Sequence, residues 1–161
     1  GDLNFKKKAT SDFACFQAWG SRGPDKYLID IIRGRWSYKE SKEFFKSFCQ
    51  KHNASTKYIE DKANGPALID DVKKDISGVR SWPESGSSLA RADKVQRLHM
   101  VSQEYEAGNV YLPENINLVD EFVLELLSFT DNGSTTGNDD MVDTSTMALI
   151  ELKKSKAFFQ G

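Results

Sequence analysis

The chain has 161 residues and a formal net charge of −2, which fits one folded domain over residues 1–161 with a proper hydrophobic core. The charge balance excludes a protein that coats nucleic acid by bulk charge, but it allows a local basic patch beside an acidic site. No apolar run approaches a membrane span, and no secretory signal opens the chain. We therefore expect an intracellular domain that is not secreted. The chain starts at Gly1 without Met, which indicates a piece excised from a longer protein.

Cysteine and histidine do not predict a metal site of their own. Cys15 and Cys49 lie in apolar stretches without ligand spacing, and free buried thiols are favoured over a disulfide. His52 and His99 have no partners at the spacing that a zinc site requires. Any metal would therefore be held by carboxylates.

The first third of the chain predicts three antiparallel strands that follow one another. Residues 13–20 are dense in aromatic and apolar side chains, and 26–33 are similar. The polar cluster 21–25 between them is typical of a tight turn, so these two strands form a hairpin. Residues 3–5 would be the stub of a preceding strand.

From Ser37 onward the apolar spacing becomes helical, and Ser37 with Glu40 predicts a capping box. The elements expected after this helix are a strand at 57–60, a helix from Pro66, a strand at 76–82, a helix at 87–101, a strand at 110–112, a helix at 115–129, a polar loop at 130–137 and a helix at 139–158. In the helix at 115–129, the apolar face is expected to include Phe122 and Leu127.

This order of elements predicts an α/β fold of the ribonuclease-H-like kind, with a mixed central sheet and helices on both of its faces. The sheet would combine the antiparallel three-strand meander with parallel strands. Such domains carry acidic residues on the first strand, at the end of the fourth strand and near the start of a late helix. Asp2, Glu60 and Asp139 stand at these three places.

Each of these acids also has an ordinary explanation. Asp2 can be a solvated terminal residue, Glu60 can belong to a charged turn, and Asp139 can cap a helix. Hydrolysis of a phosphodiester by two metal ions, however, needs carboxylates from separate elements to converge on hard cations. The combination in this topological order favours a metal site.

Four motifs and the start of the chain resemble the C-terminal nuclease domain of tailed-bacteriophage (or prophage) large terminase subunits. The motifs are Glu60-Asp61-Lys62-Ala63-Asn64-Gly65-Pro66-Ala67, Arg91-Ala92, Glu106-Ala107-Gly108-Asn109-Val110-Tyr111-Leu112-Pro113 and Asn138-Asp139-Asp140-Met141-Val142-Asp143. The resemblance covers nearly the whole chain in the same order. It implies a metal-dependent DNA endonuclease that cuts concatemeric viral DNA during genome packaging.

The resemblance also implies the residues of the site. Asp2, Glu60 and Asp139 would be the catalytic acids, and together with Asp140 they would hold two Mg²⁺ or Mn²⁺ ions. Asp12 and Asp143 would support these ligands from behind. Possible DNA contacts are Lys6, Lys7, Lys8, Lys62 and Arg91. Two positions depart from the family pattern, with Asn138 in place of a common histidine and Ser88 in place of a frequent lysine.

The expected partners are double-stranded DNA and, in the full-length protein, an ATPase domain, a small terminase subunit and a portal, in the cytoplasm of a bacterial host and away from membranes. The glycine-rich loop that holds ATP phosphates is absent from the sequence, so we expect no ATP site. The alternative is a catalytically silent module of the same fold that docks DNA or a packaging partner.

Overall fold

The computed structural model describes residues 13–61, 65–135 and 137–157. Its longest strands are β1 (Ala14–Arg22) and β2 (Asp25–Gly34), which pair antiparallel as predicted. Gly23 makes the tight turn possible, because its φ of 58° is a conformation that side chains disfavour. The short strand β5 (Val110–Tyr111) lies parallel to β2 on its other edge. The predicted strand at 3–5 lies outside the described residues.

A second pair of strands runs parallel. β3 (Lys57–Glu60) has the predicted bounds, whereas β4 (Val79–Trp82) is shorter than the predicted strand at 76–82. Among the described residues, the strands form three separate hydrogen-bonded sheets, in the orders β1-β2-β5, β3-β4 and β6-β7. The combination of antiparallel and parallel pairing confirms the predicted mixed α/β class.

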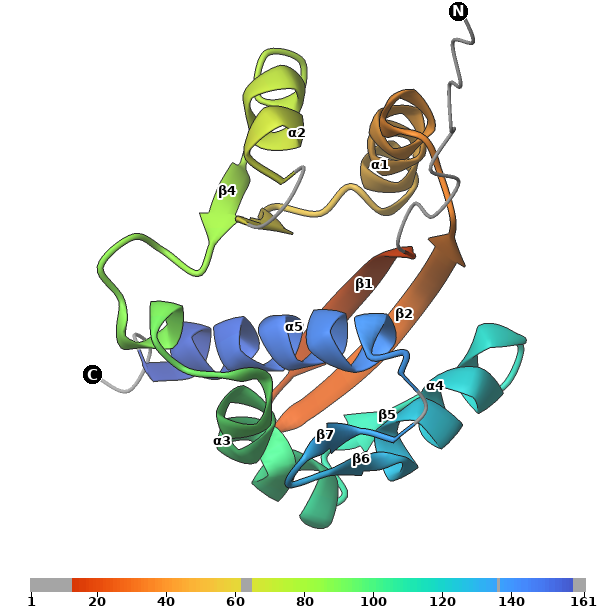
Figure 1. Ribbon diagram of the computed structural model, residues 1–161, viewed down its shortest axis with the longest axis vertical. Helices are drawn as coiled ribbons and strands as arrows, with labels where there is room; N and C mark the ends of the chain where they lie inside the picture. Colours follow the sequence, from red (N-terminus) through yellow and green to blue (C-terminus); the bar gives the residue numbers. More distant parts are fainter. Residues whose placement is uncertain (1–12, 62–64, 136, 158–161) are drawn as a thin grey trace, which may run out of the picture.

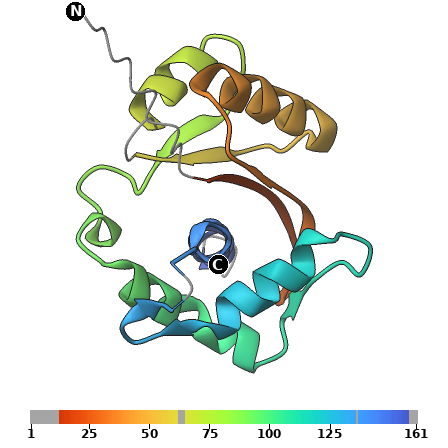
Figure 2. The ribbon, with the colours of Figure 1, turned by 45° about the vertical axis from the view of Figure 1, so that its right-hand side comes forward.

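Helices lie on both sides of the β1–β2 hairpin (Figures 1 and 2). α1 (Tyr38–His52) begins with the predicted capping box of Ser37 and Glu40. It packs on one side, where the ring centroids of Phe16 and Phe45 lie 5.4 Å apart. α4 (Leu118–Leu127) and α5 (Asp140–Ala157) pack on the other side, where Phe122 and Met141 belong to one core cluster with Leu28 and Ile31 of β2.

Two predicted segments differ from the structure. The helix expected at 87–101 is a short 3₁₀ turn, η1 (Ser88–Ala90), followed by α3 (Lys94–Glu106). The chain breaks there because Asp93 accepts a hydrogen bond from the amide of Gln96 and starts a new helix with its own capping box. The loop expected at 130–137 contains a small hairpin of β6 (Phe129–Thr130) and β7 (Gly133–Ser134).

The apolar face predicted for α4 is partly wrong. Phe122 is fully buried as expected, but Leu127 is exposed, and Glu125 is buried in its place. The helix also starts at Leu118, later than predicted, and ends before Ser128. The position of Glu125 matters for the site, because a buried carboxylate needs partners.

The remaining elements complete the core around the end of β3. α2 (Gly65–Val72) packs with α1 and the β3–β4 pair in one apolar cluster. Trp82 at the end of β4 shares another cluster with Val101 of α3 and Leu149 of α5. Ion pairs of Lys94 with Asp139 and of Arg97 with Glu60 bring the end of β3, the start of α3 and the start of α5 together. None of the helices in the described ranges is long and apolar enough to cross a membrane.

Candidate metal centre

The structure brings together acids from two separate elements. Glu60 is the last residue of β3, Asp139 directly precedes α5, and Asp143 lies one turn further along that helix. Burial raises the pKa of Asp143 to about 6, and the neighbouring carboxylates of Asp139 and Glu60 add to the rise. Asp143 therefore feels the negative charge of both Asp139 and Glu60.

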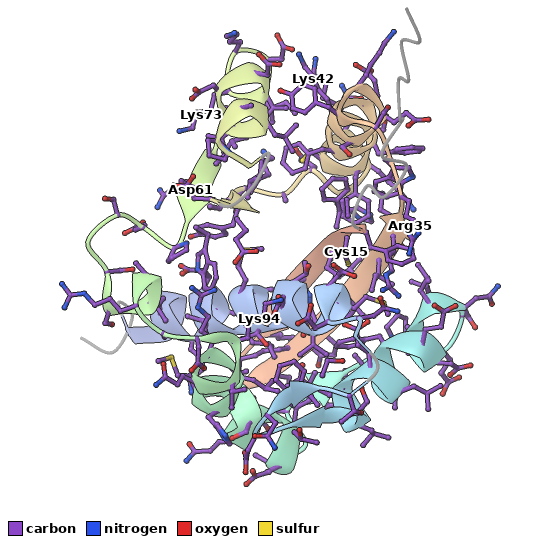
Figure 3. The ribbon with its side chains drawn as sticks, in the orientation of Figure 1. Cys15, Arg35, Lys42, Asp61, Lys73 and Lys94 are labelled. Atoms are coloured by element: carbon purple, nitrogen blue, oxygen red, sulfur yellow. The ribbon has the colours of Figure 1, made fainter. Side chains whose placement is uncertain are left out.

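Two cations of α3 face these acids. The Lys94 Nζ lies 2.8 Å from Asp139 Oδ2 and 2.6 Å from Asp143 Oδ2, so one ammonium bridges both carboxylates. Figure 3 shows Lys94 at the side of α5. Arg97, three residues further along α3, places its Nη1 3.3 Å from Glu60 Oε1. Residues three apart share one face of a helix, so α3 presents a pair of positive charges to the acid cluster.

The two cations are held very differently. The Arg97 side chain is only 8% exposed. It donates to the carbonyl oxygen of Leu89 over 3.0 Å and lies over the Trp82 ring at 4.9 Å. The Lys94 side chain is 41% exposed, and it forms ion pairs with Asp139 and Asp143 of the cluster. Although burial works against it, these carboxylates raise the pKa of Lys94 above its usual value.

The start of α5 is capped by another helix. The amides of Met141 and Val142, which an N-cap side chain usually satisfies, donate to Glu125 Oε1 of α4 over 2.8 and 2.9 Å. Burial raises the pKa of Glu125 despite these hydrogen bonds. Since Glu125 supplies the cap, the carboxylate of Asp139 is available to face Lys94 rather than its own helix. This argues against the ordinary explanation of Asp139 as a capping residue.

Asp140 points to a different partner from Asp139. Its Oδ2 accepts a hydrogen bond from Arg33 Nη2 of β2 over 3.1 Å, and the same nitrogen lies 3.8 Å from Glu125 Oε2. Arg33 is 7% exposed and lies over the Phe13 ring at 4.1 Å. Asp140 thereby ties the start of α5 to the sheet.

A cavity of about 610 Å³ separates the β1–β2 hairpin from β3, and α5 forms part of its wall. Glu60, Asp140 and Asp143 line it together with apolar residues such as Phe16 and Trp82. The acids therefore face a space that can admit a ligand, although only part of each carboxylate is exposed to solvent.

The donor set fits a hard divalent cation. The described acids offer carboxylate oxygens, which suit Mg²⁺ or Mn²⁺, and their mutual repulsion favours a bound positive charge. Within the described ranges, however, no group of three His, Cys, Asp or Glu side chains lies close enough to hold a metal ion. Asp2, the remaining predicted ligand, lies outside those ranges.

Several predicted site residues also lie outside the described residues, namely Lys6, Lys7, Lys8, Asp12 and Lys62. Arg91 is described, and it is exposed directly after η1. Sequence reasoning missed Lys94, Arg97, Arg33 and Glu125. The capping signal at Asp93 and Gln96 could have located the start of α3, and with it the shared face of Lys94 and Arg97.

The antiparallel and parallel strand pairs, covered by helices, define a mixed α/β domain. Residues 1–152 match the family model described as the terminase RNaseH-like domain, and the chain belongs to that family. This confirms the family and the fold predicted from the sequence. No curated protein matches the chain.

A solved structure supports the same fold. The large terminase nuclease from the thermophilic phage G20c, determined with bound zinc, is similar over 85% of this chain and 80% of its own chain. The TM-score is 0.53, and the sequences are 15% identical. At this identity the likeness shows the shared fold.

Proposed function

We propose that this domain is a divalent-metal-dependent endodeoxyribonuclease that cuts concatemeric viral DNA during genome packaging. The observation that carries the proposal is that Glu60 and Asp143 line one cavity, while the Lys94 ammonium bridges Asp143 to Asp139. Such a concentration of carboxylates needs positive charge beside it, part of which Lys94 and Arg97 supply, and perturbed acids of this kind cluster at functional sites.

Asp2, Glu60 and Asp139 would hold the metal ions, with Asp140 as a supplementary ligand or a positioning residue. When bound, two divalent cations would activate the attacking water and offset the charge on the departing 3′ oxygen. The part of Asp2 rests on the resemblance to the family. Asp140 serves better for positioning, because Arg33 already occupies its Oδ2.

The choice of metal follows from the ligands. The similar phage nuclease was solved with bound zinc, which is consistent with a divalent site in this fold. Carboxylate oxygens without His or Cys suit Mg²⁺ or Mn²⁺ better than zinc, which prefers nitrogen and sulfur. We therefore propose two Mg²⁺ or Mn²⁺ ions as the working cofactors.

The DNA would be held by basic side chains. Lys6, Lys7, Lys8, Lys62 and Arg91 are the proposed phosphate contacts, because cations that pair with phosphate supply binding that is independent of sequence. In a full-length protein, an ATPase domain, a small terminase subunit and a portal would bring the DNA to this domain, inside the bacterial host.

Cleavage of supercoiled plasmid in EDTA, Mg²⁺ or Mn²⁺ tests the proposal. We expect the wild type to nick DNA only with metal and Asp139→Asn to lose this activity. Asp70→Asn is the matched control, because Asp70 is exposed on α2 and lies outside the acid cluster. Full activity of Asp139→Asn would refute the assignment. DNA binding without cleavage by any variant would support the silent docking module.

A further inference from the structure

The ammonium of Lys94 occupies the position of a counter-ion in the acid cluster. It lies 2.8 Å from Asp139 Oδ2 and 2.6 Å from Asp143 Oδ2, between two side chains that are 27% and 24% exposed. Carboxylates four residues apart on a helix repel each other. The ammonium relieves this repulsion in the protein without metal.

A divalent cation on the same carboxylates would compete with this contact. Magnesium ligands lie at about 2.1 Å from the ion, so an ion that coordinates Asp139 Oδ2 would repel an ammonium that lies 2.8 Å from that atom. Metal binding is therefore favoured when Lys94 is displaced. The free energy of that displacement is subtracted from the affinity of the site.

The exposure and the flexible stem of the Lys94 side chain allow this displacement. Lys94 is partly exposed at the first position of α3, and its flexible stem can move into solvent. Arg97, by contrast, is held by Leu89 and lies over the Trp82 ring. One of the two cations on this face is thus exchangeable, and the other is fixed.

We propose that Lys94 is a built-in competitor of the metal, which stabilises the empty acid cluster and lowers its affinity for divalent cations. This inference rests on the proposed function. An approaching DNA phosphate offers both a further metal ligand and a new partner for the displaced ammonium. Metal loading is therefore favoured when DNA is present, which limits metal occupancy of the domain before it engages its substrate.

Isothermal titration of Mn²⁺ into the metal-free domain tests the proposal without relying on cleavage. Lys94→Met should bind Mn²⁺ about tenfold more tightly than wild type, equivalent to about 1.4 kcal/mol. Lys94→Arg keeps the charge and should retain weak binding. Lys46→Met is the matched control, because it removes the same charge from an ion pair with Asp75 outside the cluster, and it should bind like wild type.

Thermal unfolding gives a second readout. In EDTA, Lys94→Met should melt at a lower temperature than wild type, since its carboxylates lose their counter-ion, and Mn²⁺ should raise its Tm by more than it raises that of wild type. Lys94→Gln should behave in the same way, which keeps the test decisive if the Met variant does not fold.

Equal or weaker Mn²⁺ binding by Lys94→Met and Lys94→Gln would overturn the inference. If Mn²⁺ binds to wild type but the affinity is unchanged in the variants, only the role of Lys94 fails. If Mn²⁺ binds to no variant, the proposed metal-dependent function fails with it. Tighter binding in both variants, without cleavage of DNA, would support the competitor role and count against the nuclease.

Discussion

The two sides of the first turn of α5 both pair acidic side chains with a basic one, but the basic side chain is much more exposed on one side than on the other. On one side, Asp139 and Asp143 meet Lys94, whose side chain is 41% exposed. On the other side, Asp140 meets Arg33, which is 7% exposed, and Glu125, which is 4% exposed. The first side can exchange its cation, whereas the second is closed and tied to the backbone of α5 by the Glu125 cap.

The difference between the two sides shows how the start of α5 can be held firmly while the carboxylate of Asp139 stays available to a ligand. Glu125 satisfies the amides of the first turn, and Arg33 connects that turn to β2. Neither task uses the carboxylate of Asp139. A site built for a metal needs ligands that are fixed in position but not permanently paired, and these two sides supply one property each.

The largest effect on cleavage is expected at Asp139, in comparison with the adjacent Asp140. Asp139→Asn should reduce cleavage on the order of a thousandfold, about 4 kcal/mol in the barrier, because it removes a proposed ligand. Asp140→Asn should reduce cleavage much less but lower the melting temperature more, since it weakens the contact with Arg33. Plasmid cleavage and thermal unfolding, measured side by side, check this. Equal loss of cleavage in both variants would remove the distinction between the two sides.

On the closed side, substitution of Glu125 should reduce the stability of the fold. Glu125→Ala leaves Arg33 buried with less negative charge and exposes two amides of α5 without their acceptor. We expect a decrease of about 3 kcal/mol in the free energy of unfolding, measured with urea in EDTA. Glu121→Ala is the control, because Glu121 is 62% exposed and 3.9 Å from Arg33. If both variants unfold at the same urea concentration, Glu125 does not anchor the helix.

Local signals explain what the sequence could predict about this site. The end of β3 at Glu60 and the start of α5 after Asp139 follow from apolar spacing, turn residues and helix-start acids, which are properties of short segments. The fold class follows from the order of these segments. The family match supports the resemblance found in the motifs.

Tertiary packing explains what the sequence could not predict. Residue spacing places Lys94 and Arg97 on one face of α3, but it does not tell which side chains of other elements that face meets in the fold. Glu125 stands between apolar residues of α4, and the simple helical pattern placed Leu127 in the core instead. The hairpin of β6 and β7 has strands of only two residues, too short for an alternating pattern to show.

A smaller effect on cleavage is expected at Arg97, the buried cation of α3. Arg97→Lys keeps the positive charge but cannot contact Glu60 and the Leu89 carbonyl at once. We expect cleavage to fall about tenfold, about 1.4 kcal/mol in the barrier, and the Tm to decrease as well, because a buried contact is lost. Arg80→Lys, an exposed arginine on β4, is the matched control. A drop in Tm without a selective loss of cleavage would make Arg97 a purely structural residue.

The smallest effect is expected on stability, at Asp30 of β2, whose ion pairs lie outside the site. Burial would raise the pKa of Asp30, but hydrogen bonds from Lys51, from His52 and from the Ile31 amide outweigh it and hold the pKa below its usual value. This acid therefore stabilises the fold at a pH above its unfolded pKa of about 3.9, and the contribution is lost as the pH falls through the lower folded value.

Asp30→Asn should accordingly cost about 1 kcal/mol near pH 7, and the difference from wild type should shrink below about pH 4. Urea unfolding across this pH range measures it. Mn²⁺ affinity should be unchanged in Asp30→Asn, since Asp30 pairs with α1 and not with the acid cluster.

A variant of Glu125 that behaved in the same way, losing stability but not metal affinity, would show that the closed side holds the helix without changing the metal affinity of its acids. Weaker metal binding in the Glu125 variant alone would show that the anchor also sets the position of Asp139.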